Sequence, residues 1–173
     1  MYYATIKPVD IANGTGVRVS LFVSGCTHRC QDCFNEIAWN FHYGNEFNEE
    51  TIEMLMEMLK PSHIQGLSLL GGEPMEIVNQ KGLLPLLKRT KELYPQKNVW
   101  CYTGYVYEDL LKGGRAHCDL TDELLSYIDI LVDGPFVLSL KDIRLKFRGS
   151  SNQRIIDMNE TRKQNQIVLW EEK

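Results

Sequence analysis

The chain is 173 residues long, with 43% hydrophobic residues and a formal net charge of −4. This length favours a single domain, residues 1–173, with a real hydrophobic core, and it excludes a complete eight-fold β/α barrel. The acidic balance gives no reason to expect nucleic acid or an anionic membrane as a partner, and the chain has neither a leader-like start nor an apolar run of bilayer length, so we expect a soluble protein of the cytoplasm.

The first confident element is a strand over residues 17–23. It is preceded by residues 2–16, where a short strand and then a turn-rich stretch are expected because glycine, asparagine and proline are frequent. Residues 17–23 carry valine or leucine at every odd position, which is typical of a strand. This strand would present Ser24 and Gly25, and then a cysteine loop, at its C-terminal end.

Three cysteines lie close together in that loop, residues 24–35. Cys26, Cys30 and Cys33 have the spacing C-x3-C-x2-C. A structural zinc site needs four protein ligands, whereas an iron–sulfur cubane can be held by three thiolates with one iron left open. His28 is separated from Cys30 by one residue, so it is poorly placed to bind metal beside the flanking thiolates. The spacing therefore favours a cubane with one open iron.

Two other interpretations of these thiols stay open. They could be three free thiols, or part of a zinc site whose fourth ligand is remote in the sequence, at Cys101, Cys118 or His117. A secreted disulfide framework is not expected, because five cysteines are an odd number and three of them are too close together for ordinary bridges.

Helical segments follow the cysteine loop. A helical turn is predicted over residues 36–41, and a longer amphipathic helix begins after Asn48, a typical N-cap residue. Trp39, Phe41 and Tyr43 form an aromatic group, for which we expect core packing or a lid over the cysteines.

A strand over residues 66–70 ends at a glycine turn, Gly71-Gly72-Glu73-Pro74. Two adjacent glycines let the backbone approach a ligand closely and leave peptide groups free to bind it. Glu73 can accept a hydrogen bond from a ligand ammonium group. Most Gly-Gly-Glu-Pro sequences are ordinary turns. The evidence that this one binds a ligand comes from its position, one strand and one helix after the cysteine loop.

The second half of the chain repeats this alternation. Helices are predicted over residues 83–94, 108–112 and 121–127, and strands over residues 98–103 and 128–133. Pro85 is tolerable if it lies in the first turn of its helix. The two strands end at Thr103-Gly104 and at Asp133-Gly134.

The C-terminal segment departs from the repeat. Residues 143–148 alternate apolar and basic side chains, which predicts an edge strand with one basic face. Residues 155–156 and 167–170 are further short strands in this prediction, and the polar residues 159–166 are a loop or turn.

Short apolar strands that alternate with helices predict an α/β fold built from parallel βα units. Ligands bind such folds at the C-terminal ends of the strands. The cysteine loop, the glycine turn, Thr103 and Asp133 all fall on that edge. Because the chain is short, we predict a partial (β/α) barrel with mostly parallel strands.

The cysteine spacing together with the glycine turn resembles the radical S-adenosylmethionine superfamily. Phe34-Asn35, residues 133–136 and residues 148–154 narrow the resemblance to the activating enzymes of anaerobic (class III) ribonucleotide reductases, and it covers nearly the whole chain. One departure is visible: many members have an aromatic residue directly before the third cysteine, where this chain has Asp32.

The resemblance implies a [4Fe-4S] cluster on Cys26, Cys30 and Cys33, with S-adenosylmethionine at the open iron. It implies an oxidoreductase that cleaves S-adenosylmethionine reductively to methionine and a 5′-deoxyadenosyl radical, which abstracts hydrogen from a glycine of the target reductase. The implied cofactor-binding residues are Asp32, Cys33 and Phe34 on the adenine side, Gly71, Gly72 and Glu73 at the methionine ammonium, and Thr103 and Asp133 as further contacts. No catalytic acid or base is required.

The implied partners are the large subunit of an anaerobic ribonucleotide reductase and a low-potential electron donor such as flavodoxin. One alternative is an activase of another glycyl-radical enzyme, although such relatives frequently carry extra cysteine clusters that this sequence lacks. The other is a non-enzymatic zinc or iron–sulfur binding module.

Overall fold

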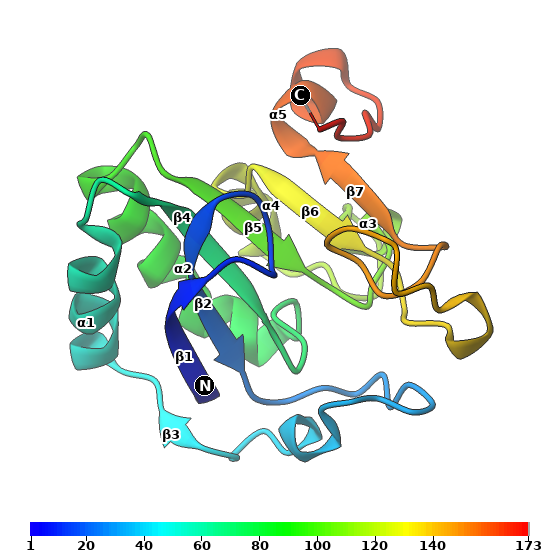
Figure 1. Ribbon diagram of the computed structural model, residues 1–173, viewed down its shortest axis with the longest axis horizontal. Helices are drawn as coiled ribbons and strands as arrows, with labels where there is room; N and C mark the ends of the chain where they lie inside the picture. Colours follow the sequence, from blue (N-terminus) through cyan, green and yellow to red (C-terminus); the bar gives the residue numbers. More distant parts are fainter. Residues whose placement is uncertain (173) are drawn as a thin grey trace.

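Seven strands form one sheet, in the order β3-β1-β2-β4-β5-β6-β7, in the computed structural model, which describes residues 1–172 (Figure 1). The strands are β1 Tyr2–Asp10, β2 Val17–Val23, β3 Asn45–Glu46, β4 Ile64–Gly71, β5 Asn98–Tyr102, β6 Ile130–Asp133 and β7 Arg154–Asp157. The central strands β2, β4, β5 and β6 are parallel, whereas β1, β3 and β7 pair antiparallel with their neighbours. The α/β prediction is therefore confirmed, and the sheet is open, with β3 and β7 at its edges.

The helices are α1 Glu49–Leu59, α2 Ile77–Leu93, α3 Tyr107–Leu110, α4 Thr121–Ser126 and α5 Met158–Gln164, with short 3-10 helices η1 Glu36–Trp39 and η2 Leu138–Leu140. Helices α1 to α4 lie in the connections between the parallel strands, whereas α5 follows β7 (Figure 1). Asn48 caps α1 as predicted, because its side chain accepts a hydrogen bond of 3.0 Å from the Thr51 backbone N–H. None of the helices within residues 1–172 is both long and apolar enough to cross a bilayer.

The main hydrophobic core lies between the sheet and helices α1, α2 and α4. Leu21 of β2, Leu69 of β4 and Cys101 of β5 are fully buried in it together with leucines of these helices. Side chains alternate across a strand, so Trp100 points to the opposite face. There it forms a second, smaller apolar cluster with Phe147 and Trp170. Their ring centroids lie 5.3 and 5.4 Å from the centroid of the Trp100 ring.

Both faces of β2 are buried, which its alternating sequence does not predict. Arg18 is fully buried, donates from Nε to the Ser68 hydroxyl at 2.7 Å and lies over the Trp100 ring at 5.6 Å. Burial lowers the pKa of Arg18 to about 10. Ser20 donates to the Asp10 carboxylate at 2.6 Å. Polar residues of the second face are thus satisfied inside the protein rather than by solvent.

Four predictions about secondary structure are wrong. Residues 167–170 do not form a strand, because only Leu169 makes an isolated bridge, to Ile156. Pro85 lies inside α2 rather than in its first turn, because the helix already begins at Ile77. Residues 143–148 are not a strand: Asp142 accepts hydrogen bonds from the backbone and side chain of Arg144, and Phe147 has a left-handed φ of +59°. Both features turn the backbone, so the alternating pattern there does not lead to strand pairing, and the apolar Ile143 is 91% exposed.

Residues 159–166, predicted as a loop, contain most of α5. Asp157 caps this helix by accepting from the Glu160 N–H at 3.0 Å, and Asn165 ends it with a φ of +53°. Met158 and Thr161 are the buried residues of the helix. Because they are three positions apart, they share one face, but this is too short a stripe to be recognised among polar neighbours.

Candidate functional site

A cavity of about 750 Å³ opens near the C-terminal ends of β2, β4 and β5. The predicted site residues that line it are Cys26, Cys30, Cys33, Phe34, Gly71, Gly72, Glu73 and Thr103. Asp32 and Asp133 are not among the lining residues. The cysteine loop and the glycine turn, which are far apart in sequence, therefore share one cavity wall because β2 and β4 are adjacent and parallel.

The cysteine loop leaves β2 at Gly25, whose φ of +101° is favourable only for glycine. The three cysteines of the loop are free thiols and partly exposed. Burial raises the pKa of the Cys26 thiol to about 11, and hydrogen bonds from the backbone N–H groups of His28 and Arg29 oppose this rise. Burial also raises the pKa of Cys30. Metal ligation, which requires thiolates, would thus release protons here.

The structure does not bring the remote zinc ligands considered above to this loop. Cys101 is fully buried in β5 on the helix-covered face of the sheet. Cys118 contacts Gln80 through its sulfur at 3.6 Å, and His117 pairs with Asp122 at 3.0 Å. Within residues 1–172, no three His, Cys, Asp or Glu side chains converge as ligands of a single metal ion.

Gly71 and Gly72 pack directly against the backbone that leads into the cysteine loop. A Cβ atom at Gly71 would lie 2.7 Å from the backbone N and O of Val23, and one at Gly72 would lie 2.6 Å from the Gly25 carbonyl oxygen. The Gly72 N–H also donates to the Val23 carbonyl at 2.8 Å, and the Glu73 N–H to the Gly25 carbonyl at 2.8 Å. The glycines therefore serve the close approach of two backbone segments as well as lining the cavity.

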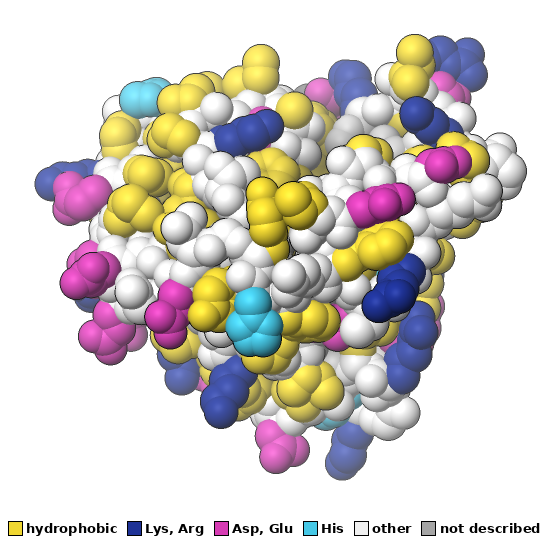
Figure 2. All heavy atoms as spheres, turned by 90° about the horizontal axis from the view of Figure 1, so that it is seen from below, with side chains coloured by type: hydrophobic (Ala, Val, Ile, Leu, Met, Phe, Trp, Pro, Cys, Tyr) yellow, Lys and Arg dark blue, Asp and Glu magenta, His cyan; other side chains and the backbone are white. Residues whose placement is uncertain are grey.

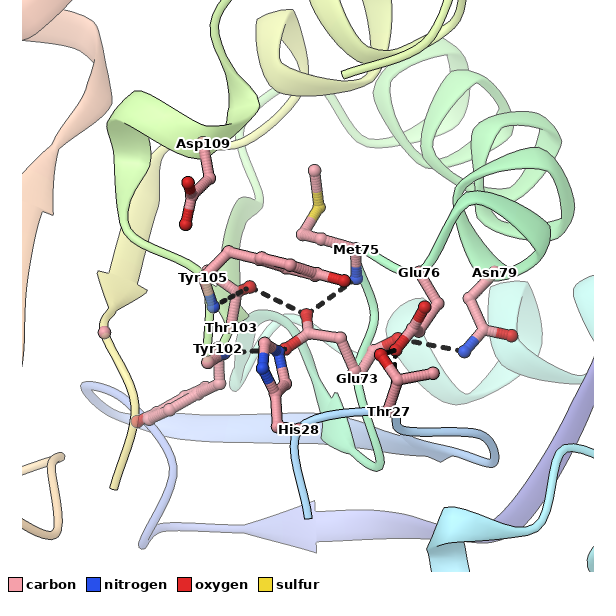
Figure 3. A network of polar contacts seen from close by, with 12 residues as sticks. Thr27, His28, Glu73, Met75, Glu76, Asn79, Tyr102, Thr103, Tyr105 and Asp109 are labelled. Atoms are coloured by element: carbon pink, nitrogen blue, oxygen red, sulfur yellow. Dashed lines mark hydrogen bonds and ion pairs between the residues drawn. The ribbon is translucent and has the colours of Figure 1, made fainter. Parts of the chain in front are cut away.

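The Glu73 carboxylate is almost completely buried and accepts four hydrogen bonds from the protein (Figure 3). Oε1 accepts from the Met75 N–H at 2.8 Å and the Thr103 hydroxyl at 2.7 Å. Oε2 accepts from the Gly104 N–H at 2.6 Å and lies 2.7 Å from His28 Nε2. Glu73 thus joins β4, β5 and the cysteine loop.

A second carboxylate holds the same loop. Glu76 Oε1 accepts from the backbone N–H of Thr27 at 2.7 Å and from its hydroxyl at 2.6 Å. Sequence reasoning missed both Glu76 and the role of His28. The only signal was their position within a few residues of the cysteines or of the glycine turn.

Asp133 lies at the end of β6, but its side chain is taken up by other elements. Its carboxylate accepts from the Tyr107 N–H at 2.7 Å and forms an ion pair with Arg154, whose Nε lies 3.0 Å from Oδ1. Arg154 also pairs with Glu108 at 2.7 Å. Asp133 therefore connects β6 with β7 and α3.

Phe34 and Asp32 behave differently within the loop. Phe34 is 88% exposed, lines the cavity and lies edge-on to Phe136 with 6.0 Å between ring centroids. Asp32 has a left-handed φ of +53°. Asp32 thus contributes to the turn that places Cys33.

Comparison with known proteins identifies the family. Residues 12–156 match the family model described as a 4Fe-4S single cluster domain. The chain is 41% identical over 157 residues to the anaerobic ribonucleoside-triphosphate reductase-activating protein of Haemophilus influenzae, covering 90% of this chain and 97% of that protein. The proteins of the same name from Escherichia coli K12 and Enterobacteria phage T4 are 40% and 39% identical over 155 residues, covering 88% and 90% of this chain and 96% and 93% of theirs. The chain belongs to the family of anaerobic ribonucleoside-triphosphate reductase-activating proteins.

Membership of this family confirms the resemblance seen in the cysteine spacing and the glycine turn, and with it the prediction of an activating enzyme. The 4Fe-4S domain match supports an iron–sulfur cluster. Cysteine thiolates are the usual ligands of such clusters, so the three thiols of the cysteine loop fit this cofactor.

Two unpaired polar groups in the cavity wall also fit a site for a polar cofactor. Trp39 Nε1 and the Tyr102 hydroxyl are buried, and neither has a hydrogen-bond partner within residues 1–172. Buried donors are normally paired, and these two unpaired donors belong to residues that line the same cavity as the three thiols. Sequence reasoning noted Trp39 only as part of an aromatic group and missed Tyr102.

Proposed function

We propose that the protein activates an anaerobic ribonucleotide reductase by generating a glycyl radical on it. The observation that carries this proposal is the common cavity of Cys26, Cys30, Cys33, Gly71 and Gly72 at the ends of two adjacent parallel strands. The names of the relatives, which state activation of the anaerobic reductase, support the same function.

In this proposal Cys26, Cys30 and Cys33 hold a [4Fe-4S] cluster. A cluster held by these thiols beside S-adenosylmethionine would supply the electron that cleaves S-adenosylmethionine into methionine and a 5′-deoxyadenosyl radical. That radical would take a hydrogen atom from a glycine of the reductase and leave as 5′-deoxyadenosine. A low-potential donor such as flavodoxin provides the electron. The protein contributes ligands, orientation and exclusion of water.

The remaining site residues divide into two groups. Gly71 and Gly72 present backbone groups for the methionine end of S-adenosylmethionine, and Phe34 is the aromatic residue placed to contact adenine. Glu73 and Thr103 line the same wall, but their oxygens already accept hydrogen bonds from protein donors. They therefore position the surrounding backbone and do not contact the ligand directly. By the same reasoning Asp133 has a structural role. Asp32, which does not line the cavity, acts through the left-handed turn before Cys33.

The open sheet supports a protein substrate. We infer that it is the partial barrel of the radical S-adenosylmethionine fold, whose open side leaves the cavity accessible to a loop of the reductase. Phe34 and Ile37 next to the cavity are 88% and 58% exposed. Figure 2 views the molecule from below in the orientation of Figure 1, the side of the cysteine loop and η1, and shows many hydrophobic side chains on that face. Exposed apolar side chains around a cavity favour docking of another protein.

Anaerobic reconstitution tests the function. Protein loaded with iron and sulfide, then given S-adenosylmethionine and dithionite, should release 5′-deoxyadenosine. Addition of the reductase large subunit should give the electron paramagnetic resonance signal of a glycyl radical. Cys30→Ala should lose the cluster and both activities, because two thiolates do not retain a cubane at useful affinity, whereas Cys118→Ala should keep all three.

The alternatives predict other results. A binding module would hold metal but release no 5′-deoxyadenosine. An activase of another glycyl-radical enzyme would cleave S-adenosylmethionine yet leave the anaerobic reductase without a radical. A full four-iron cluster in Cys30→Ala would contradict the ligand assignment.

A further inference from the structure

The side chain of His28 connects the cysteine loop to the neighbouring strand ends. Its Nε2 lies 2.7 Å from Glu73 Oε2, and the two side chains are only 11% and 1% exposed. Figure 3 shows the imidazole pointing from the cysteine loop toward Glu73, with Thr103 and Tyr105 of the next strand end close by. His28 is therefore a buried polar link inside a loop whose other side chains are largely at the cavity or in solvent.

The His28 ring packs closely against Tyr105 and Gly104. The ring lies edge-on to Tyr105 with 4.4 Å between centroids. A Cβ atom at Gly104 would lie 2.7 Å from His28 Cδ2, so only glycine at position 104 allows the ring to approach. The other three acceptor positions of Glu73 are taken by Met75, Thr103 and Gly104. The carboxylate itself is thus rigid, and His28 is fixed against a fixed partner.

Fixing His28 also fixes the backbone next to Cys26. The backbone N–H groups of His28 and Arg29 favour the Cys26 thiolate and oppose the rise that burial causes in its pKa. Arg29 has a left-handed φ of +49°, a conformation that needs support from its surroundings. Hydrogen bonds to cluster sulfurs are one of the factors that set the reduction potential of an iron–sulfur cluster.

We propose that His28 is a positioning residue: its contact with Glu73 holds the backbone amides of residues 28 and 29 against Cys26 and so raises the reduction potential of the cluster. The amides partly neutralise the charge on the thiolate, and the reduced cluster, which carries one more negative charge, gains more from them than the oxidised cluster does. The inference rests on the proposed function only in assigning the cluster to Cys26, Cys30 and Cys33.

The test compares four proteins after anaerobic reconstitution: wild type, His28→Ala, His28→Gln and His117→Ala. Glutamine can place an amide N–H near the position of Nε2, so it can restore the contact with Glu73. His117 pairs with Asp122 at 3.0 Å, has only 17% of its side chain exposed and does not line the cavity, so it is the matched control. Redox titration of the cluster, followed by electron paramagnetic resonance, gives the midpoint potential of each protein.

We expect a lower midpoint potential and altered g values for His28→Ala. At the wild-type midpoint, its ratio of reduced to oxidised cluster should fall by about ten-fold, equivalent to about 59 mV for a one-electron couple. The midpoint potential of His28→Gln should lie close to the wild-type value, and that of His117→Ala should equal it. Equal potentials in His28→Ala and wild type, or equal shifts in His28→Ala and His117→Ala, would overturn the proposal.

If His28→Ala holds no cluster, His28→Asn takes its place, because its amide is one carbon too short to reach Glu73. A lower potential in His28→Asn than in His28→Gln supports the proposal, and equal values reject it. The potential is measured without S-adenosylmethionine. A wild-type cluster that fails to cleave S-adenosylmethionine would therefore refute the proposed function while leaving this test intact.

Discussion

At the scale of single residues, Glu73 shows how a predicted site residue can have a different main role. The sequence predicts it as an acceptor for a ligand ammonium group. In the folded protein its two oxygens accept from four protein donors, three of which belong to the turn after β5 and to the cysteine loop. Its replacement should therefore disturb the arrangement of the loop before it affects ligand contacts.

Glu73→Gln tests this role. The amide nitrogen of glutamine would face two of the four donors, so at least one buried donor loses its acceptor. We expect the substitution to lower the free energy of unfolding of the cluster-free protein by about 1–3 kcal/mol. Urea unfolding measures the change, with Glu57→Gln on the exposed side of α1 as a control that should be nearly neutral. Unchanged stability in Glu73→Gln, with weaker S-adenosylmethionine binding alone, would instead favour direct contact with the ligand.

At the scale of elements, Arg154 links three of them. It brings β7 to the Asp133 carboxylate of β6 and to Glu108 of α3. The Asp133 side chain is 1% exposed, and its carboxylate contacts this guanidinium group and the Tyr107 N–H. The ends of β6 and β7 are thereby fixed beside the segment that contributes Phe136 and Gln153 to the cavity wall.

Arg154→Gln should be strongly destabilising at neutral pH. The substitution leaves a buried carboxylate without its cation, which costs about 3 kcal/mol in comparable buried pairs. The free energy of unfolding in urea measures the loss. Arg144→Gln is the matched control, since Arg144 pairs with Asp142 but is 87% exposed, and little change is expected there. Equal effects of the two substitutions would contradict the assignment.

The same ion pairs give a pH dependence. The hydrogen bond from Arg154 lowers the pKa of Glu108 below its ordinary value of 4.5. A carboxylate with a lowered folded-state pKa stabilises the protein above the unfolded-state pKa, and this contribution is lost as the pH falls through the folded-state pKa. The stability difference between wild type and Arg154→Gln should therefore narrow between about pH 6 and about pH 3. A constant difference would exclude this linkage.

At the scale of the whole molecule, the fold does not depend on the cysteine loop for its core. The main apolar core lies between the sheet and α1, α2 and α4, and the smaller cluster around Trp100 lies on the other face. The cysteine loop is attached at one edge by Glu73, Glu76 and the glycine turn. The rest of the domain thus supplies the contacts that position this loop.

Removal of the cluster should therefore leave the domain folded. After chelation under argon, the far-ultraviolet circular dichroism spectrum should be unchanged and unfolding should remain a single cooperative transition at a moderately lower temperature, since the cluster stabilises only the native state. Small zinc domains behave differently, because they unfold without metal. Loss of most helical and strand signal on chelation would show that the cluster is needed for folding.

Local patterns in the sequence were sufficient for much of the fold and for the main features of the site. The alternation over residues 17–23 gives β2, Asn48 gives the start of α1, and the spacing of Cys26, Cys30 and Cys33 indicates the cluster. Each depends on residues a few positions apart, where backbone geometry alone relates side chains. The polar helix α5 and the turn at residues 143–148 were missed because their signals are caps and φ angles rather than periodicity.

Only the tertiary structure decided which partners the polar side chains take. Glu73 and His28 are 45 residues apart, and Asp133 and Arg154 are 21 apart. Whether they meet depends on the order of strands in the sheet and on the face to which each side chain points. A sequence specifies the donor and acceptor at each position, but the sheet determines whether a carboxylate meets a ligand, an imidazole or a guanidinium group.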